Sequence, residues 1–505
     1  MERLSFFLFL TIFLLVSFLI CVIPLDYLLH FSLDDAYFYY KTALNYASGA
    51  GSTFDGINTT NGYHPLWFFV LSTYYSVLLK LDIDDVAYIF RATLILSTLL
   101  NMGGLYFIYR ILEVYLNKTF RLSAFIVIST FLVMLAMFHV MGLEIHLLIF
   151  FLSLYYYFIA VEESGRENRL ILRATIVGLI TVTRLDLILL LFPAIIITEI
   201  IFLNKVYKSK KITPVFIFIV IAIIPFILFI LYNFITFGHI STTSGTLEFC
   251  FPKTQFFNNF PHPIQQPIRF GLLLFSLAPI VLFYLFGRIK SPPGLKTILI
   301  LLLPGYLSSI IFIIVHYLYN LNGAREWYYS LPLFYAAFYI LPFITISNIN
   351  YKSIWLPVLS ILVFYFFIYK NEYYDMSDAY VYSKIINETV PPSKIIFQVD
   401  YSGLVGFFSE RKVINGDGLI NSFEYSSYLK NNDLKSYFNI YPIDYYSTYA
   451  YSNPIKDGIF MDKLFTPGGY KFIFPEKNII IQSKKSHGGF FRRRLGTFYL
   501  IKVDN

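Results

Sequence analysis

Long apolar runs separated by short polar loops fill roughly the first 370 residues of the chain. Most of these runs approach the roughly 20 residues that an α-helix needs to cross the hydrocarbon core of a bilayer. The eleven runs lie at about 5–25, 88–112, 120–138, 144–161, 171–183, 187–204, 213–235, 270–287, 297–319, 329–346 and 353–369. The pattern predicts an α-helical polytopic membrane domain of about 11 spans, in which the short run 171–183 has room to be partly re-entrant.

A further apolar run, 64–80, decides the topology. Four basic loops separate the other runs, at 110–121, 166–173, 205–211 and 288–296. If 64–80 does not cross, all four fall on the side of the N-terminus, which agrees with the excess of Lys and Arg in cytoplasmic loops. We therefore expect 64–80 to be a helix that lies in the outer interface or dips into it. The N-terminus is then cytoplasmic and the C-terminus extracytoplasmic.

The pattern changes at about residue 370. Apolar runs shorten to strand length at 395–399, 470–474, 478–482 and 497–503, and residues 376–389 and 422–431 have helical patterns. The tail of about 135 residues is long enough for a small independent domain. We expect a membrane domain over 1–369 and an extracytoplasmic α/β domain over 370–505.

Composition supports an integral membrane protein. Of 505 residues, 57% are hydrophobic and 14% are charged, whereas about 25% are charged in a soluble protein. The net charge of +8 comes from basic residues clustered in short loops, so it reports topology, and we expect no nucleic-acid partner. Two cysteines, Cys21 and Cys250, suggest neither a disulfide framework nor a metal site. The run 5–25 beside Arg3 lacks a cleavage signature and is interpreted as an uncleaved anchor.

Candidate chemistry begins with two adjacent acids, Asp34 and Asp35, just past the first apolar run. Two carboxylates at the mouth of a membrane helix are costly unless they face water, a cation or a substrate. A structural alternative exists for one of them, because Ser32 followed by Asp35 resembles a capping box at a helix start. That alternative leaves Asp34 without a structural role, so Asp34 is the better functional candidate.

Other unusual polar residues fall at the outer ends of the expected spans or in outer loops. They are Glu144, Arg184 with Asp186, His239 and Arg325. Each has a structural alternative. Glu144 lies near two histidines as a possible interfacial hydrogen-bonding residue, Arg184 and Asp186 fit a snorkelling pair, and Arg325 fits an interfacial anchor. A cleft at the outer face explains why they all lie on one side.

Several short motifs occur in a recognisable order. They are Asp34-Asp35-Ala36-Tyr37, the loop at Gly49 to Gly51, Asn61-Gly62-Tyr63-His64-Pro65-Leu66-Trp67, Met141-Gly142-Leu143-Glu144, Thr183-Arg184-Leu185-Asp186, Phe237-Gly238-His239-Ile240, Arg325-Glu326-Trp327-Tyr328-Tyr329 and Gly416-Asp417-Gly418-Leu419-Ile420-Asn421-Ser422. Together they resemble the GT-C superfamily of polytopic glycosyltransferases, and most closely the bacterial branch that includes mycobacterial terminal arabinofuranosyltransferases. Leu185 departs from the pattern, because relatives often have proline there.

The resemblance implies a transferase that takes a sugar from a polyprenyl-phosphate donor in the outer leaflet and passes it to a glycan, lipid or protein acceptor. The attacking hydroxyl must lose a proton, which needs a carboxylate base, and Asp34 is the first candidate. Asp35 or Glu144 would orient the acceptor, support the base or hold a divalent cation. The departing phosphate needs a fixed cation, for which Arg184 is the first choice and Arg325 the second. The apolar spans beside the site would hold the isoprenoid tail, and membrane lipids are further expected partners.

The same resemblance makes four further residues candidates for substrate contacts: Tyr63, His64, His239 and Asp417. Each has a structural alternative that the sequence leaves open. His64 before Pro65 fits a helix cap equally well, and Asp417 between two glycines fits a simple turn.

Two rival functions remain open. A transporter or lipid flippase is also polytopic and carries buried charges, but it usually places them near the midplane and often shows repeated halves, which this sequence lacks. A membrane receptor that displays the tail would leave the acid pair and the arginines unexplained. The sequence does not indicate which sugar, acceptor or lipid length is used.

Overall fold

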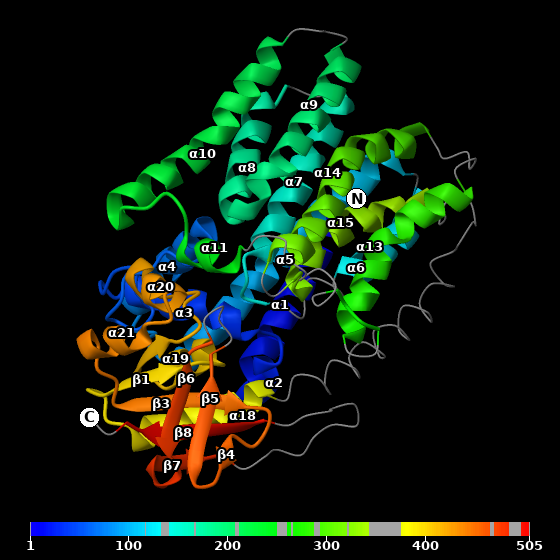
Figure 1. Cartoon of the computed structure of the whole chain (residues 1–505). Coiled ribbons are helices and arrows are strands. Elements are labelled where there is room, and N and C mark those ends of the chain that lie inside the picture. Colours follow the sequence, from blue (N-terminus) through cyan, green and yellow to red (C-terminus); the bar gives the residue numbers. More distant parts are fainter. Residues whose placement is uncertain are drawn as a thin grey trace.

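The structure is a computed structural model (Figure 1). It describes residues 2–116, 118–132, 141–165, 168–207, 212–249, 260–263, 266–286, 293–320, 323–342, 375–464, 469–483 and 496–503. The expected run 353–369 lies outside these residues.

A bundle of long helices makes up most of the molecule. Its helices are α1 (Glu2–Val22), α5 (Val86–Tyr115), α6 (Lys118–Leu132), α7 (Ile145–Glu163), α8 (Leu170–Thr183), α9 (Leu191–Tyr207), α10 (Thr213–Phe237), α13 (Pro267–Phe286), α14 (Pro293–Tyr319) and α15 (Ser330–Tyr339). Shorter elements gather at one end of this bundle. They are α2 (Leu25–Leu29), α3 (Asp34–Ala47), α4 (Pro65–Lys80), η2 (Leu185–Leu189), α11 (Thr243–Glu248) and η3 (Glu326–Tyr329).

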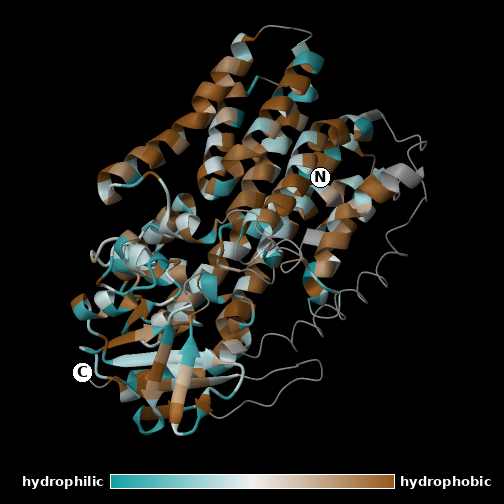
Figure 2. Ribbon diagram, in the orientation of Figure 1, coloured by the Kyte–Doolittle hydropathy of each residue, from teal (hydrophilic) through white to brown (hydrophobic). Residues whose placement is uncertain are grey.

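Apolar residues dominate the bundle, whereas hydrophilic residues concentrate toward the tail and the loops (Figure 2). Within the described residues, four helices are long and apolar enough to cross a membrane: Val86–Tyr115, Ile145–Glu163, Thr213–Phe237 and Gly294–Tyr319. Three shorter apolar helices are Phe6–Val22, Leu170–Thr183 and Pro267–Val281. The polytopic helical domain is therefore present, and the number of 11 spans stays a prediction.

The helix boundaries correct one of the expected runs. Residues 187–204 do not form one helix, because the 3-10 turn η2 ends at Leu189 and α9 begins at Leu191. The turn follows Arg184, whose extended backbone (φ −142°, ψ 111°) ends α8. The run 64–80 forms the expected helix, α4, which starts with Pro65 in its first turn. Proline suits that position because its missing N–H has no partner there in any helix.

The tail forms the expected α/β domain. A five-stranded sheet has the order β2-β1-β3-β8-β7, with β1 parallel to β2 and β3, and β8 antiparallel to β3 and β7. Its strands are β1 (Ile395–Gln398), β2 (Lys412–Asn415), β3 (Tyr445–Ala450), β7 (Ile479–Gln482) and β8 (Thr497–Lys502). A second, antiparallel sheet joins β4 (Ile455–Lys456), β5 (Ile459–Lys463) and β6 (Lys471–Pro475), and β6 leads through the 3-10 turn η4 (Glu476–Asn478) to β7. The helices are α18 (Asp375–Thr389), α19 (Ser402–Phe408), α20 (Phe423–Lys430) and α21 (Leu434–Ile440).

The α/β domain packs directly on the helical bundle through α19. Phe407 and Phe408 contact the ring of Tyr37 in α3, with centroid separations of 5.8 and 5.7 Å, and Phe408 also meets Phe90 in α5. Tyr37 is fully buried in this contact. Helix α3, which begins with the acid pair, is therefore held between the bundle and the tail.

Candidate functional site

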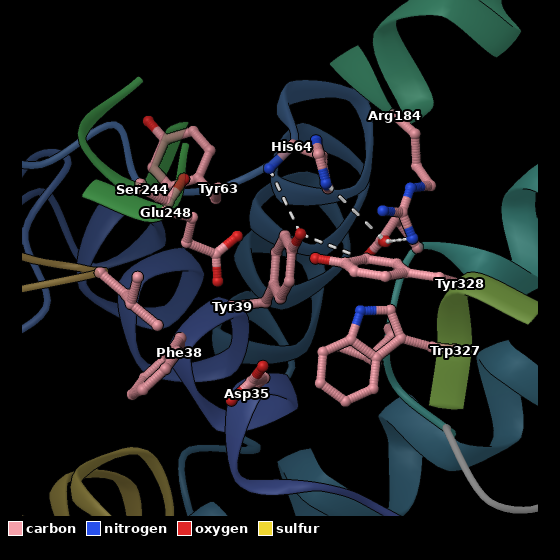
Figure 3. Close-up of a pocket in the computed structure, with 14 residues that line it drawn as sticks. Asp35, Phe38, Tyr39, Tyr63, His64, Arg184, Ser244, Glu248, Trp327 and Tyr328 are labelled. Atoms are coloured by element: carbon pink, nitrogen blue, oxygen red, sulfur yellow. Dashed lines mark hydrogen bonds and ion pairs between the residues drawn. The ribbon is translucent and has the colours of Figure 1, made fainter. Parts of the chain in front are cut away.

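A pocket opens where the short elements meet the α/β domain. It is an open cavity of about 600 Å³, counting the solvent at its mouth. Its walls come from α3, the loop before α4, the start of α7, the end of α8, α11, η3 and the loop after β2 (Figure 3). The lining residues are Asp35, Phe38, Tyr39, Gly62, Tyr63, His64, Leu143, Glu144, Arg184, Ser244, Glu248, Trp327, Tyr328 and Leu419.

Five of the nine residues singled out in the sequence line this pocket: Asp35, Tyr63, His64, Glu144 and Arg184. Both domains contribute to its wall, since Leu419 belongs to the tail. The two parts approach so closely that a Cβ on Gly62 would lie 1.9 Å from the carbonyl oxygen of Leu419. Only glycine fits at that position.

The acid pair divides in a way that contradicts the sequence argument. Asp34 has a structural role, because its carboxylate accepts the backbone N–H groups of Leu404 (2.7 Å) and Gly403 (3.2 Å) at the start of α19. Asp34 thereby caps a helix of the other domain. The expectation that Asp34 has no structural role is therefore wrong.

The expected capping box is also absent. The N-cap of α3 is Leu33, which makes no side-chain cap, and the Ser32 hydroxyl donates to the carbonyl of Met141 at 2.9 Å. Asp35 lies in the first turn of α3 but makes no cap there, and it points into the pocket (Figure 3). No residue in the described part of the chain donates a hydrogen bond to its carboxylate.

Burial shapes the charge of both acids. It raises the pKa of Asp34 to about 8, although the N–H of Leu404 acts in the opposite direction. Burial also raises the pKa of Asp35, which Arg325 lowers and Glu144 raises further. Two neighbouring carboxylates of this kind hold protons more strongly than free aspartates.

Glu144 and Arg184 form a closed ionic network on one wall. Arg184 binds both oxygens of Asp186 through Nε (3.1 Å) and Nη2 (2.6 Å), and its Nη1 lies 3.3 Å from Oε1 of Glu144. His316 reaches Asp186 at 3.4 Å from the far side. The Arg184 guanidinium also lies 4.7 Å from the ring centroid of Tyr328. Arg184 and Glu144 are each only 2% exposed, so this is a buried network and does not snorkel to the interface.

Tyr39 and His64 extend that network across the pocket. The Tyr39 hydroxyl donates to Oε2 of Glu144 at 3.1 Å and accepts the backbone N–H of His64 at 3.3 Å. Nδ1 of His64 accepts the backbone N–H of Leu185 at 3.3 Å, and its Nε2 lies 3.9 Å from Glu144. Leucine at position 185 supplies a donor that proline lacks. His64 thus joins the two loops as well as lining the pocket.

Arg325 supplies a second cation near the pocket mouth. It precedes η3 and is half-buried, and its guanidinium makes no hydrogen bond or ion pair with any residue that the structure describes. It lies near enough to lower the pKa of Asp35 and of Glu248. Unlike Arg184, this arginine has its hydrogen-bonding capacity available.

The remaining candidates lie outside the pocket lining. His239 is exposed and stacks on Phe423 of α20, with ring centroids 3.8 Å apart. Asp417 accepts the N–H of Leu419 at 2.9 Å, which is the turn that its glycine neighbours suggested. It is nevertheless close to the site, because burial raises its pKa to about 7 and Asp35 contributes to the increase.

Sequence reasoning missed several pocket residues. Glu248 is the most important, because it is a carboxylate on the wall provided by α11. The others are aromatic or small residues, including Phe38, Tyr39, Trp327, Tyr328 and Ser244. Trp327 and Tyr328 belong to the motif that begins at Arg325, but only the arginine was predicted to be a site residue. Glu248 lies in no motif, and only the polar composition of residues 241–248 marked the segment.

No group of three or more His, Cys, Asp or Glu side chains in the described part of the chain is arranged to hold a metal ion. Asp35 and Glu144 both line the pocket, but Glu144 is engaged by Arg184 and Tyr39. A divalent cation at Asp35 and Glu144 stays a prediction.

The fold has relatives among solved structures, although no protein-family model and no curated protein matches the sequence. ArnT from Cupriavidus metallidurans, bound to undecaprenyl phosphate, matches 87% of this chain and 92% of its own, with a TM-score of 0.51 and 10% identity. Two structures of the Archaeoglobus fulgidus oligosaccharyltransferase each match 83% of this chain and 65% of their own at 10% identity. One is AglB with an inhibitory peptide and a dolichol-phosphate (TM-score 0.42), and the other is tethered to an acceptor peptide (TM-score 0.45).

The two oligosaccharyltransferase scores are too low to support an argument, whereas the match to ArnT covers nearly all of both chains. At 10% identity it concerns the fold alone, and the mycobacterial branch stays a prediction. The match shows that the chain has the fold of ArnT.

Proposed function

We propose that this protein is a glycosyltransferase that passes a sugar from a polyprenyl-phosphate-linked donor to a cell-envelope glycan, lipid or protein acceptor. The observation that carries the proposal is the pocket at one end of an apolar bundle, where a carboxylate without a described donor lies beside a cation without a described partner. The ArnT structure, which has the same fold, is bound to undecaprenyl phosphate. A lipid-linked donor places its phosphate at the boundary between membrane and water, which is where such a pocket would be needed.

Asp35 is the general base in this proposal, in place of Asp34. The acceptor hydroxyl donates its proton to the Asp35 carboxylate as its oxygen bonds to the anomeric carbon. The bond between that carbon and the phosphate oxygen breaks, and the electron pair leaves with the polyprenyl phosphate. Asp34 helps to position Asp35, because its hydrogen bonds join the start of α3 to α19.

Arg325 is the preferred cation for the departing phosphate, because its guanidinium fork is available for bidentate binding. Arg184 supplies fixed positive charge, but its N–H groups already contact Asp186 and Glu144. Arg184 would stabilise the phosphate by electrostatic attraction at a distance. Direct contact with the phosphate would require the ionic network to rearrange. His64, Tyr63 and Asp417 remain candidates for contacts to the sugar, whereas His239 is the weakest of them.

The proposed topology keeps the N-terminus cytoplasmic and the tail outside, with about 11 spans and α4 at the outer interface. Two contacts support this arrangement of α4. The Tyr75 hydroxyl lies 2.6 Å from that of Thr93, within the first turns of α5, and those turns lie at the α/β domain because Phe90 contacts Phe408. Both ends of α4 therefore stay at the same end of the bundle.

A transfer assay tests the proposal. The full-length protein in nanodiscs is incubated with radiolabelled undecaprenyl-phosphate sugars and with extracted envelope glycans, lipids or peptides as acceptors. Transfer of label with stoichiometric release of undecaprenyl phosphate is expected. A transporter or flippase would instead move the labelled lipid across the bilayer of a proteoliposome without releasing its phosphate, and that result would overturn the proposal.

A further inference from the structure

Glu248 stands on the pocket wall that α11 provides. It ends the short helix α11, which begins at its N-cap Thr242, whose side chain accepts the N–H of Gly245. Oε2 of Glu248 accepts Nδ2 of Asn320 at 3.2 Å, and a backbone bridge joins Phe249 to the same Asn320. These contacts fix the carboxylate in place. In Figure 3 its carboxylate points toward the Tyr39 ring, and Asp35 lies below that ring.

Apart from Asp35, three other carboxylates at or near the pocket are already engaged. Glu144 and Asp186 share Arg184, and Asp34 holds two backbone N–H groups of α19. Oε1 of Glu248, by contrast, has no hydrogen-bond donor among the residues that the structure describes. Glu248 is half-buried and lines the cavity, so this oxygen is available to accept a hydrogen bond from a ligand that enters it.

The chemistry around Glu248 indicates the class of ligand. Trp327 and Tyr328 present aromatic rings to the same cavity, 5.7 Å apart and inclined at 70°. An aromatic ring and a carboxylate that line the same cavity fit a sugar ring, whose C–H face packs on the aromatic ring while its hydroxyls donate to the carboxylate. Burial and the nearby Asp35 raise the pKa of Glu248 to about 7, although Arg325 acts in the opposite direction.

We propose that Glu248 and Trp327 form a subsite that binds a neutral sugar ring of the acceptor, with Glu248 accepting hydrogen bonds from its hydroxyls. This inference rests on the proposed function and names its acceptor as a glycan. The ring would lie between the Trp327 surface and the Glu248 carboxylate. Its attacking hydroxyl would then face Asp35 on the neighbouring wall.

Binding of a simple sugar ligand tests the subsite without requiring transfer. Octyl glycosides, below their critical micelle concentration, are titrated into the protein in nanodiscs while tryptophan fluorescence is followed. We expect saturable binding that Glu248→Gln weakens about ten- to hundredfold, as loss of hydrogen bonds to a charged group predicts. Trp327→Phe should remove the fluorescence signal. Thr246→Ala, in the same helix with its hydroxyl on the Thr243 carbonyl, is the matched control and should bind normally.

Transfer kinetics then separate this inference from the proposed function. Glu248→Gln should raise the KM for the glycan acceptor by the same factor and leave the KM for the lipid donor unchanged. Equal octyl glycoside binding by Glu248→Gln and the wild type would overturn the subsite. Selective binding of a hydroxylated peptide in place of the glycosides would also overturn it. Normal glycoside binding without transfer from any donor would overturn the proposed function and leave the sugar subsite standing.

Discussion

Helix α8 has a buried arginine near each end, and the two arginines differ in their surroundings. Arg173 near its start and Arg184 just past its end lie about 16 Å apart along the helix axis, and each is buried with two carboxylates. At the first end, Arg173 binds both oxygens of Glu199 at 2.9 and 3.0 Å and also Glu162. Tyr155 and Tyr207 donate to these same acids at 3.0 and 2.6 Å.

The difference lies in what surrounds each cluster. Arg173, Glu162 and Glu199 are between 0 and 2% exposed and line no cavity that is described. The Arg184 cluster forms a pocket wall, beside two carboxylates, Asp35 and Glu248, that no described cation pairs with directly. A buried arginine network is therefore not in itself a sign of function. What indicates function is the pair of carboxylates, Asp35 and Glu248, that lack a direct cationic partner among the described residues at the end that meets the α/β domain.

The comparison predicts its largest effect at Asp35. Asp35→Asn keeps the shape of the side chain but cannot accept a proton, so transfer should fall by about 10²–10⁴ while the donor lipid still binds. Asp34→Asn should lose less, because it removes one acceptor from the α19 cap and no base. Rates and donor affinity are measured for both variants in nanodiscs. A dead Asp34→Asn beside an active Asp35→Asn would restore the assignment expected from the sequence.

At the opposite end of α8, Arg173→Met should act on stability alone. Removing one partner of a buried ionic network leaves uncompensated charge and typically costs about 3–5 kcal/mol. We expect a large loss of thermal stability, measured by unfolding in detergent, with unchanged turnover per folded molecule. Reduced turnover of the folded fraction would show that the two ends are coupled, and the distinction between them would then fail.

Arg184→Lys should affect the pocket more than the fold. Lysine keeps the charge but cannot bind Asp186 with two parallel hydrogen bonds while also reaching Glu144. A charge-assisted contact is worth about 1.5–3 kcal/mol, so we expect turnover to fall about ten- to hundredfold. Arg325→Lys is the companion variant. If it alone reduces donor affinity, Arg325 is the residue that binds the phosphate.

Much of the architecture was predictable from the sequence because apolar length is a local property. The helices α5, α7, α10 and α14 and the change of pattern near 370 followed directly from it. The central strand β3 was missed, since its sequence Tyr-Tyr-Ser-Thr-Tyr-Ala has little apolar alternation and is buried by the strands on either side. Pairing with neighbours, which the sequence does not display, creates that strand.

The site shows the same division between local and distant information. Adjacency of Asp34 and Asp35 suggested a site, but the acid with a structural contact is Asp34, whose partner lies 369 residues away in the chain. Glu248 lies in no motif, since its position in the site depends on the pocket that α11 forms with segments distant in the chain. A helix cap made between domains cannot be recognised from a local motif.

The smallest predicted effect is a pH dependence of stability that comes from the burial of Asp34. An unfolded aspartate titrates near 3.9, whereas burial raises the pKa of Asp34 to about 8. The folded state therefore holds the proton more strongly. The stability from this group is fully present below about pH 4 and is lost as the pH rises through about 8. We expect the thermal midpoint, followed by tryptophan fluorescence, to decline between pH 6 and 9. Asp34→Asn, which does not titrate, should show a shallower decline, and Glu248 and Asp417, with pKa values of about 7, should supply the remainder. Identical slopes for the wild type and Asp34→Asn would mean that Asp34 stays ionised at the domain junction.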